Sequence, residues 1–493
     1  MQTIKYLKTD SAKLYEGYTS GKVIIELLWG DRVELLPGDP ENGRVKVRAR
    51  GQEGFVRQSD LGDNPLLEIY FIDVGQGDGV LIVTPDRKHI LVDGGYPRKD
   101  QNHGKSAADF VDWKFFHDYG ENRITLDCMI SSHCDADHYG GLWDLVNPSG
   151  KDELECKEEI AIKNYYHPGV AWWKKTQGKK FTGASAGGYL TDLMEDSASV
   201  KKALKAGAGR ELAGEWAKFM ECLVSLNVPF SRLAYAPSKG TGFLPGFDNP
   251  AKVTIRILGP VETMVNGKPA LKDFGDDSQN TNGNSLALRI DYGRTRTLVA
   301  GDLNKTSEQY LLEQYKGNRL EFAADVYKSC HHGSDDCSYE FLETVHASAS
   351  IISSGDNETH SHPRPNIVAA CGSTGFRKIE NDELITPLVF CTEIARSIRM
   401  GDPYEVDCKG LILNGQKVDV KLADRKKTEI LYTRSISPGL QPSKKKKTMD
   451  RVKVIDGLVY GLVNVRTDGD TILCATLNEG KSKWEIKKFP SRF

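Results

Sequence analysis

The chain has 493 residues, and at roughly 150 residues per domain this length predicts about three domains. Hydrophobic residues make up 39% and charged residues 27%, an ordinary globular composition with enough apolar material for a sizeable core. There are 66 Lys and Arg against 68 Asp and Glu, a formal net charge of −2. This balance excludes a polycation that coats nucleic acid and an acidic solvating tail, so binding to a polyanion would need a local basic groove.

The sequence also predicts a cellular compartment. Residues 1–8 contain no apolar stretch of signal-peptide length, and no window approaches the ~20 apolar residues of a membrane span. Ten cysteines lie between Cys128 and Cys474 without a CxxC pair, which favours reduced thiols over a disulfide framework. We therefore expect a cytoplasmic protein with no membrane partner.

Residues 1–64 are expected to form a small β module. Short strand-like runs at 23–28, 32–36 and 44–48 are separated by turns that contain glycine, and a natural boundary follows at Asp63-Asn64-Pro65. This order of strands and turns resembles a bacterial SH3-like domain. The resemblance implies a small β-barrel and a possible docking surface for a protein partner.

From residue 66 the pattern changes to longer apolar strands that alternate with helical stretches, which predicts an α/β domain. The periodicity at about 175–225 is helical and indicates an insertion, after which strands resume. The expected strands are 67–74, 80–84, 89–93, 253–258, 285–291, 296–300, 326–329 and 350–353.

The last part of the chain is predicted to contain three pieces. A β-rich region at about 385–434 closes the large domain, a basic linker spans 435–450, and a small β-rich module spans 451–493. Lys444–Lys447 within the linker has three interpretations. These are solvated linker residues, a contact to a nucleic-acid backbone, or a site for a lysine-directed regulatory protease that would make the last 45 residues a removable cap.

The strongest chemical signal follows the apolar strand expected at 126–130. Within six positions it places two histidines and two carboxylates ahead of Gly140-Gly141, where the chain turns into a helix. Imidazole with carboxylate suits a borderline or hard divalent ion, and burying such a group is costly unless a cation compensates the carboxylates. The alternative interpretation is a solvated acidic loop. The four residues are His133, Asp135, Asp137 and His138.

Two further motifs also follow predicted strands. Gly301-Asp302 ends the strand at 297–300, and His331-His332 follows the strand at 325–328. Side chains placed just after strand ends are what a site at the edge of an open sheet requires. We therefore expect these motifs to share one site.

The order of these motifs resembles the metallo-β-lactamase fold, an αββα sandwich. More narrowly, it resembles the hydrolase domain of ComEC-type DNA-uptake proteins, and the resemblance covers about residues 66–420 apart from the insertion. It implies a hydrolase domain at 66–434. The narrower resemblance is carried by Asp73-Val74-Gly75-Gln76-Gly77-Asp78, Leu91-Val92-Asp93-Gly94-Gly95, Asn284-Ser285-Leu286 and His362-Pro363.

The resemblance implies two divalent metal ions, Mn²⁺ or Zn²⁺ with Mg²⁺ as a further possibility. One ion would be held by His133 and Asp135 and the other by Asp137, His138 and either His331 or His332, with Asp302 as the bridge. Asp93 would orient the loop. The broad family has a further histidine ligand, for which His167 is the candidate; a packing or surface histidine is the alternative.

One departure from the broad family concerns the first metal. The family usually has histidine where this chain has Asp135, and a carboxylate there favours Mn²⁺ or Mg²⁺. Asp137 or Asp302 would accept the proton of the attacking water. His362 and Lys328 are candidate substrate contacts, and for Lys328 the alternative is a solvated surface charge.

The favoured function is metal-dependent phosphodiester hydrolysis of DNA or RNA through a metal-activated water, as a stand-alone nuclease that acts in defence against foreign nucleic acid. One alternative is a hydrolase of a small-molecule lactone, thioester or phosphoester, and another is a non-enzymatic, metal-containing binding module. A basic stripe that leads to the site would favour the nuclease, whereas a closed apolar pocket would favour the small-molecule hydrolase.

Overall fold

The structure is a computed structural model in which the chain divides into two compact units. The first unit comprises Met1–Ala395, Tyr460–Asn478 and Ser482–Phe493, and the second comprises Arg396–Val459 and Glu479–Lys481. The described residues are 3–101, 104–147, 151–175, 179–207, 209–238, 240, 242–355, 362–392, 462–478 and 483–493, together with the backbone of six strands between 399 and 456.

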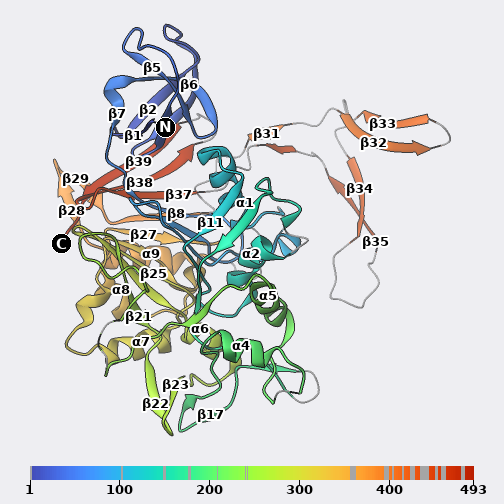
Figure 1. The fold of residues 1–493 in the computed structure, drawn as a ribbon, viewed down its shortest axis with the longest axis vertical. Helices are drawn as coiled ribbons and strands as arrows, with labels where there is room; N and C mark the ends of the chain where they lie inside the picture. Colours follow the sequence, from blue (N-terminus) through green and yellow to red (C-terminus); the bar gives the residue numbers. More distant parts are fainter. Residues whose placement is uncertain are drawn as a thin grey trace. The chain divides into compact units, whose positions relative to one another are not determined.

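The N-terminal residues form one antiparallel sheet of seven strands in the order β3-β2-β6-β5-β4-β1-β7 (Figure 1). Alternation along Arg44–Ala49 turns every second side chain into a core that includes Val45, Val47 and Val56. The SH3-like resemblance stays a prediction for this sheet. Its strands are β1 (Thr3–Leu7), β2 (Ser11–Tyr15), β3 (Val23–Leu28), β4 (Arg32–Leu35), β5 (Arg44–Ala49), β6 (Gln52–Arg57) and β7 (Leu61–Gly62).

A nine-stranded sheet begins the large domain, in the order β19-β14-β12-β10-β9-β8-β37-β38-β39. Four neighbouring strands, β10, β12, β14 and β19, run parallel, so their carboxyl ends lie at one edge. The strands are β8 (Leu67–Phe71), β9 (Val80–Val83), β10 (His89–Val92), β12 (Cys128–Ile130), β14 (Tyr165–His167), β19 (Phe230–Arg232), β37 (Val463–Thr467), β38 (Thr471–Asn478) and β39 (Lys483–Pro490).

A second sheet of seven strands has the order β20-β21-β24-β25-β26-β27-β30. Apolar residues of both sheets, such as Ile82 and Leu288, share one buried core, so the two sheets pack face to face. The strands are β20 (Gly242–Phe243), β21 (Thr254–Gly259), β24 (Ala287–Tyr292), β25 (Thr295–Ala300), β26 (Val326–Lys328), β27 (Ala349–Ile352) and β30 (Leu388–Cys391).

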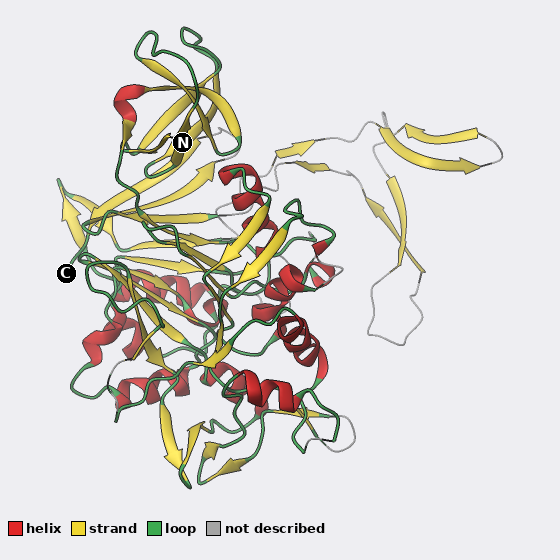
Figure 2. Ribbon diagram, in the orientation of Figure 1, coloured by secondary structure: helices red, strands yellow, loops and turns green. Residues whose placement is uncertain are grey.

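Helices cover the outer faces of both sheets, and this confirms the expected αββα arrangement (Figure 2). One core joins the first sheet to α1 (Ala107–Trp113), α2 (Ala136–Val146), α4 (Ser197–Ala203) and α5 (Gly214–Ser225). Another joins the second sheet to α7 (Lys305–Gln314), α8 (Tyr339–Val345) and α9 (Pro365–Thr374), and α6 (Asp277–Gly283) precedes β24. None of the helices in the described residues has the length and hydropathy to cross a bilayer.

The insertion expected to be helical contains strands as well as α4 and α5. The two-residue strands at 173–174 and 180–181 form one hairpin, and those at 185–186 and 189–190 form another. The second hairpin joins two longer strands at 262–272 in a four-stranded sheet. Segments this short carry too little periodicity to be predicted from sequence. The strands are β15 (Trp173–Lys174), β16 (Lys180–Phe181), β17 (Ser185–Ala186), β18 (Tyr189–Leu190), β22 (Glu262–Val265) and β23 (Lys268–Lys272); elsewhere β11 (Arg123–Leu126) pairs with β13 (Glu159–Ile162), and β28 (Lys378–Glu380) with β29 (Glu383–Thr386).

The C-terminal strands are not the separate module that the sequence predicts. β37 lies between β8 and β38 in the nine-stranded sheet, with Val465 opposite Ile69. Arg466 on this strand is fully buried, and its Nη1 lies 2.7 Å from Oδ1 of Asp31 in the N-terminal sheet. A local strand pattern does not reveal its pairing partner, which explains the difference. This inner position of β37 argues against a removable C-terminal cap.

The second unit contains three strand pairs, among them the segment expected to be a linker. Lys444–Met449 forms β35 and pairs antiparallel with β34, so Lys444–Lys447 belongs to a strand; the rest of the predicted linker at 435–450 lies outside the described residues. Residues 396–434, the last part of the predicted hydrolase domain, belong to the second unit, and the domain boundary at 434 stays a prediction. The strands are β31 (Arg399–Gly401), β32 (Glu405–Leu413), β33 (Gln416–Lys421), β34 (Thr428–Thr433), β35 (Lys444–Met449) and β36 (Val454–Asp456).

Candidate metal centre

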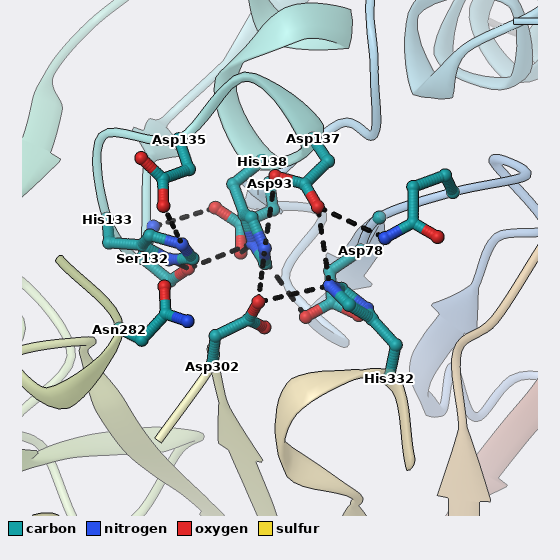
Figure 3. Close-up of polar contacts among 12 residues, drawn as sticks. Asp78, Asp93, Ser132, His133, Asp135, Asp137, His138, Asn282, Asp302 and His332 are labelled. Carbon is teal, nitrogen blue, oxygen red and sulfur yellow. Dashed lines mark hydrogen bonds and ion pairs between the residues drawn. The ribbon is translucent and has the colours of Figure 1, made fainter. Parts of the chain in front are cut away.

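The chemically active side chains follow strand ends in both sheets, as the sequence predicts. His133 lies in the loop after β12, and Asp135 is the residue immediately before α2. Asp302 follows β25, and His332 lies in the short turn Cys330–Gly333 after β26. Figure 3 shows these residues around one space where the edges of the two sheets meet.

Glycines allow the loops around the centre to approach one another closely. Gly77 has a φ of +110°, and a Cβ there would lie 1.9 Å from the backbone oxygen of Asp137. A Cβ on Gly141 would lie 2.0 Å from the oxygen of Gly94. Only glycine fits such contacts, so these residues hold the N-terminal loops against the start of α2.

His138 is held between two carboxylates. Its Nδ1 donates to Oδ2 of Asp93 at 2.9 Å, and its Nε2 lies 3.2 Å from Oδ2 of Asp302. Burial acts to lower the pKa of His138, but the charges of Asp302 and Asp93 raise it well above its usual value. The surroundings of this imidazole therefore attract positive charge.

His332 has a comparable arrangement. Its Nδ1 lies 3.2 Å from Oδ1 of Asp78, and its Nε2 lies 3.1 Å from Oδ2 of Asp302 and 3.6 Å from Oδ2 of Asp137. Burial opposes ionisation of Asp302, yet His138 and His332 hold the pKa of this carboxyl well below its usual range. The Asp302 carboxylate is thus the point on which two imidazoles converge.

Lys328 is placed differently from the substrate contact that the sequence suggests. The side chain is 1% exposed; its Nζ pairs with Asp78 and donates to the backbone oxygen of Ala300 at 2.7 Å. β26 is buried on both faces, so a charged residue at its end needs an internal partner. Lys328 therefore holds Asp78, which faces His332, and does not face substrate.

His133 and Asp135 lie on the other side of the centre (Figure 3). Nδ1 of His133 lies 3.1 Å from the Ser132 hydroxyl, and Nε2 lies 3.6 Å from Oδ2 of Asp135. The Asp135 carboxylate accepts hydrogen bonds from Nε1 of Trp172 at 3.0 Å and from the Thr281 hydroxyl at 2.9 Å. Both oxygens are thereby fixed in orientation, and each keeps a lone pair.

Asp137 faces the opposite flank. Nε2 of Gln76 donates to its Oδ2 at 3.2 Å, and this contact positions the carboxylate. Burial raises the pKa of Asp137, but His138 and then His332 outweigh it and lower this pKa below its usual value. Asp137 is therefore a carboxylate, the form in which it can hold a cation or accept a proton.

The donor atoms fit a divalent cation. Among the described residues, Nε2 of His133, His138 and His332 and Oδ1 of Asp302 are buried without a hydrogen-bond partner. Donor atoms of Asp78, His138, Asp302 and His332 lie within 4.8 Å of one another. Buried polar groups normally have partners, and imidazole with carboxylate is a ligand set for borderline divalent ions. A metal centre accounts for the unpartnered atoms.

The remaining candidate histidines differ in placement. His331 is one-quarter exposed, and its Nε2 lies 3.9 Å from Oδ2 of Asp302, so His332 is the better placed ligand of the two. His167 is fully buried at the end of β14, and its ring nitrogens lack hydrogen bonds within the described part of the chain. Burial, with a smaller effect of Arg232, lowers its pKa to about 3. His362 lies with its ring 5.9 Å from that of His331.

The sequence does not predict several residues that position the ligands. Asp78 belongs to a glycine-rich motif that indicates only the family, and its partners lie about 250 residues later in the chain. Gln76, Trp172 and Thr281 act on the ligands through hydrogen bonds between distant segments. Their spacing in the sequence carries no signal for these contacts.

Comparison with known proteins agrees with this geometry. Residues 72–333, just over half of the chain, match the family model of the metallo-beta-lactamase superfamily. The chain belongs to this superfamily. The metallo-beta-lactamase fold of the two packed sheets is therefore that of its family.

Two curated relatives support a ComEC-like hydrolase domain. ComE operon protein 3 of Bacillus subtilis (strain 168) is 22% identical over 325 residues, 64% of this chain and 32% of that protein. Competence protein ComA of Neisseria gonorrhoeae is 31% identical over 102 residues, 20% of this chain and 14% of that protein. The chain thus spans at most about a third of the length of either relative.

Solved structures give weaker similarity. A diphosphatase of the PhnP family covers 66% of this chain and 94% of its own, with 10% identity and a TM-score of 0.29. NlpC2 of Trichomonas vaginalis covers 18% of this chain and 42% of its own, with 16% identity and a TM-score of 0.12.

Proposed function

We propose that this metallo-beta-lactamase superfamily member is a metal-dependent phosphodiesterase that hydrolyses DNA or RNA. The observation that carries the proposal is the set of buried, unpartnered imidazole and carboxylate atoms around Asp302. The ComEC-like relatives add support for nucleic acid as the substrate, because one of them is a competence protein.

The ligand set supports a centre with two divalent ions, Mn²⁺ or Zn²⁺, with Mg²⁺ as a further possibility. His133 and Asp135 would hold one ion, and Asp137, His138 and His332 the other, with Asp302 between them. Such ions would supply a Lewis acid for a phosphate oxygen and a water of lowered pKa. Donor atoms of His138, Asp302 and His332 lie within 4.8 Å of one another, and the ring centre of His133 lies 3.9 Å from that of His138, which supports a shared centre.

The chain's own residues perform the remaining tasks. Asp93 accepts a hydrogen bond from Nδ1 of His138, and Asp78 lies 3.2 Å from Nδ1 of His332. These contacts direct Nε2 of each ring towards Asp302. Gln76 fixes Oδ2 of Asp137, so Oδ1 of this carboxylate is the acceptor for the proton of an attacking water. Asp302 is the alternative proton acceptor. His362, whose ring centre lies 5.9 Å from that of His331, is proposed to contact substrate.

A substrate panel tests the proposal. Plasmid DNA, single-stranded DNA, single-stranded RNA, bis(p-nitrophenyl) phosphate and a lactone are incubated with the protein and Mn²⁺, Mg²⁺ or Zn²⁺, with Asp302→Ala as the control. We expect cutting of nucleic acid that this substitution abolishes. Turnover of the lactone or the small diester alone would favour a small-molecule hydrolase, and absence of all turnover would favour a binding module.

Three further expectations stay predictions. They are the cytoplasmic location, a protein partner at the N-terminal sheet, and a regulatory protease acting at Lys444–Lys447.

A further inference from the structure

A basic hairpin lies beside the metal centre. β15 and β16 and their flanking residues carry four exposed lysines: Lys174, Lys175, Lys179 and Lys180. Lys174 forms an ion pair with Glu211 at 3.2 Å. For the other three, the structure shows no acidic partner within the described part of the chain. In a chain with a net charge of −2, this hairpin is a local excess of positive charge.

The hairpin contacts a residue of the metal centre through one side chain. Nζ of Lys180 lies 3.8 Å from the centre of the Trp172 ring, and Nε1 of Trp172 donates to Oδ1 of Asp135 at 3.0 Å. Trp172 is 9% exposed, so its ring is a fixed support for the ammonium group. The positive surface is therefore continuous with the Asp135 side of the centre.

The ring of Phe181, on the same hairpin, lies close to two further cationic side chains. Nζ of Lys175 lies 5.5 Å from the centre of the Phe181 ring, and the Arg210 guanidinium lies 5.1 Å from it. Arg210 also pairs with Asp192 at 2.8 Å, so it contributes less free charge than the lysines. Stacking on a ring restricts a long side chain, which lowers the entropy cost of binding a phosphate.

We infer that the β15–β16 hairpin binds the phosphate backbone of the nucleic acid and guides the strand to the metal centre at the Asp135 side. This inference rests on the proposed function. Exposed lysines on two paired strands suit a polyanion, whereas a small phosphoester would need cations that converge on a pocket. Continuity with Asp135 favours a substrate strand over an acidic protein partner.

Charge removal tests the inference. The triple variant Lys175→Ala/Lys179→Ala/Lys180→Ala is compared with Lys201→Ala/Lys202→Ala/Lys205→Ala, which removes the same charge from exposed positions in and just after α4. Binding of a cleavage-resistant phosphorothioate oligonucleotide, as DNA or as RNA, is followed by fluorescence anisotropy over a salt series in the presence of the metal. Rates are measured on unmodified DNA and on bis(p-nitrophenyl) phosphate.

We expect the hairpin variant to bind at least about tenfold more weakly. Its plot of log affinity against log salt should be less steep, with a slope smaller in magnitude by about 2 to 3. The ratio of kcat/KM on DNA to kcat/KM on the small diester should fall similarly, while the α4 variant stays near wild type. Equal binding and equal slopes in the two variants would overturn the inference.

The two proposals fail in different ways. If wild type cuts DNA and the hairpin variant cuts and binds it equally well, the proposed function stands and the hairpin is not the binding surface. If wild type cuts no nucleic acid but the hairpin variant alone loses oligonucleotide binding, the hairpin assignment stands and the proposed nuclease function fails.

Discussion

Nδ1 of His138 donates a 2.9 Å hydrogen bond to Oδ2 of Asp93, and both side chains are buried. His332 stands in a similar relation to Asp78, with Nδ1 at 3.2 Å from the carboxylate. Asp93 follows β10, whereas Asp78 lies in the loop between β8 and β9, and each directs a histidine ring towards Asp302. The N-terminal half of the chain thus orients ligands that come from two different motifs.

Asp93→Asn should weaken the metal centre without unfolding the protein. The amide is a poorer acceptor than the carboxylate for Nδ1 of His138, and loss of such a partner costs about 10–100-fold in metal affinity. Affinity is measured by competition with a chromogenic chelator. Asp196→Asn is the control, because Asp196 is an exposed helix cap where asparagine serves equally well. Equal affinities in both variants would contradict the assigned role of Asp93.

Asp78→Asn should destabilise the fold. Lys328 is buried, and its ammonium group pairs with Asp78 and donates to the backbone oxygen of Ala300. The substitution therefore removes its nearest balancing charge. Breaking a buried pair in this way costs about 3–5 kcal/mol, seen as a lower urea midpoint. Asp78→Asn/Lys328→Met should recover much of the loss. A double variant as unstable as the single one would show that the charge pair is not the cause.

Gly77→Ala should disturb the start of α2. Its φ of +110° is unfavourable for alanine, and the added Cβ would lie 1.9 Å from the Asp137 oxygen. Gly43→Ala is the matched control, since its φ is +71° but a Cβ there has open space. We expect Gly77→Ala to cost about 1–3 kcal/mol more than the control in thermal unfolding. Similar melting temperatures would mean that the close approach of the two loops is unimportant.

His89 should make the protein sensitive to acid. Burial beside Phe115 and Tyr119, with a smaller effect of Arg87, lowers its pKa from 6.5 to about 3. The unfolded chain therefore binds a proton at higher pH than the folded chain. The stabilising contribution is complete above about pH 6.5 and is lost as the pH falls towards 3, at up to about 1.4 kcal/mol per pH unit.

Thermal unfolding at pH 7 and pH 5 checks this effect. The melting temperature of wild type should fall more between the two values than that of His89→Gln, which cannot take up the proton. Parallel falls in the two proteins would assign the acid sensitivity to other groups.

The strands that end the chain should stay bound after cleavage in the second unit. A site for a specific protease is inserted after Lys447; β37 lies between β8 and β38, so the fragment carrying it remains paired through the sheet. The two fragments should elute together in size exclusion and separate only in denaturant. Val465→Asp, which places a charge in the buried core, should release the fragment on cutting. Separation of the unsubstituted fragments in buffer would contradict this arrangement.

The sequence predicts the parts of the site that follow strand ends. His133, Asp302 and His332 come directly after buried apolar strands, and the fold brings the ends of those strands to one edge. The structure places Lys328 differently from the predicted substrate contact, because its position near a ligand motif does not determine the direction of its side chain. The pairing of β37 was not predictable for a related reason. Alternation identifies a strand, but the choice of β8 as its partner depends on contacts between residues almost 400 positions apart.

The measurement that tests the central claim most directly is metal titration into protein stripped by a chelator, with plasmid cutting as the readout. The account predicts that stripped protein is inactive, that cutting returns in proportion to bound metal, and that Asp302→Ala recovers no activity at any metal concentration. Cutting by the stripped protein, or by Asp302→Ala at the wild-type rate, would contradict a metal centre at Asp302 as the source of the activity.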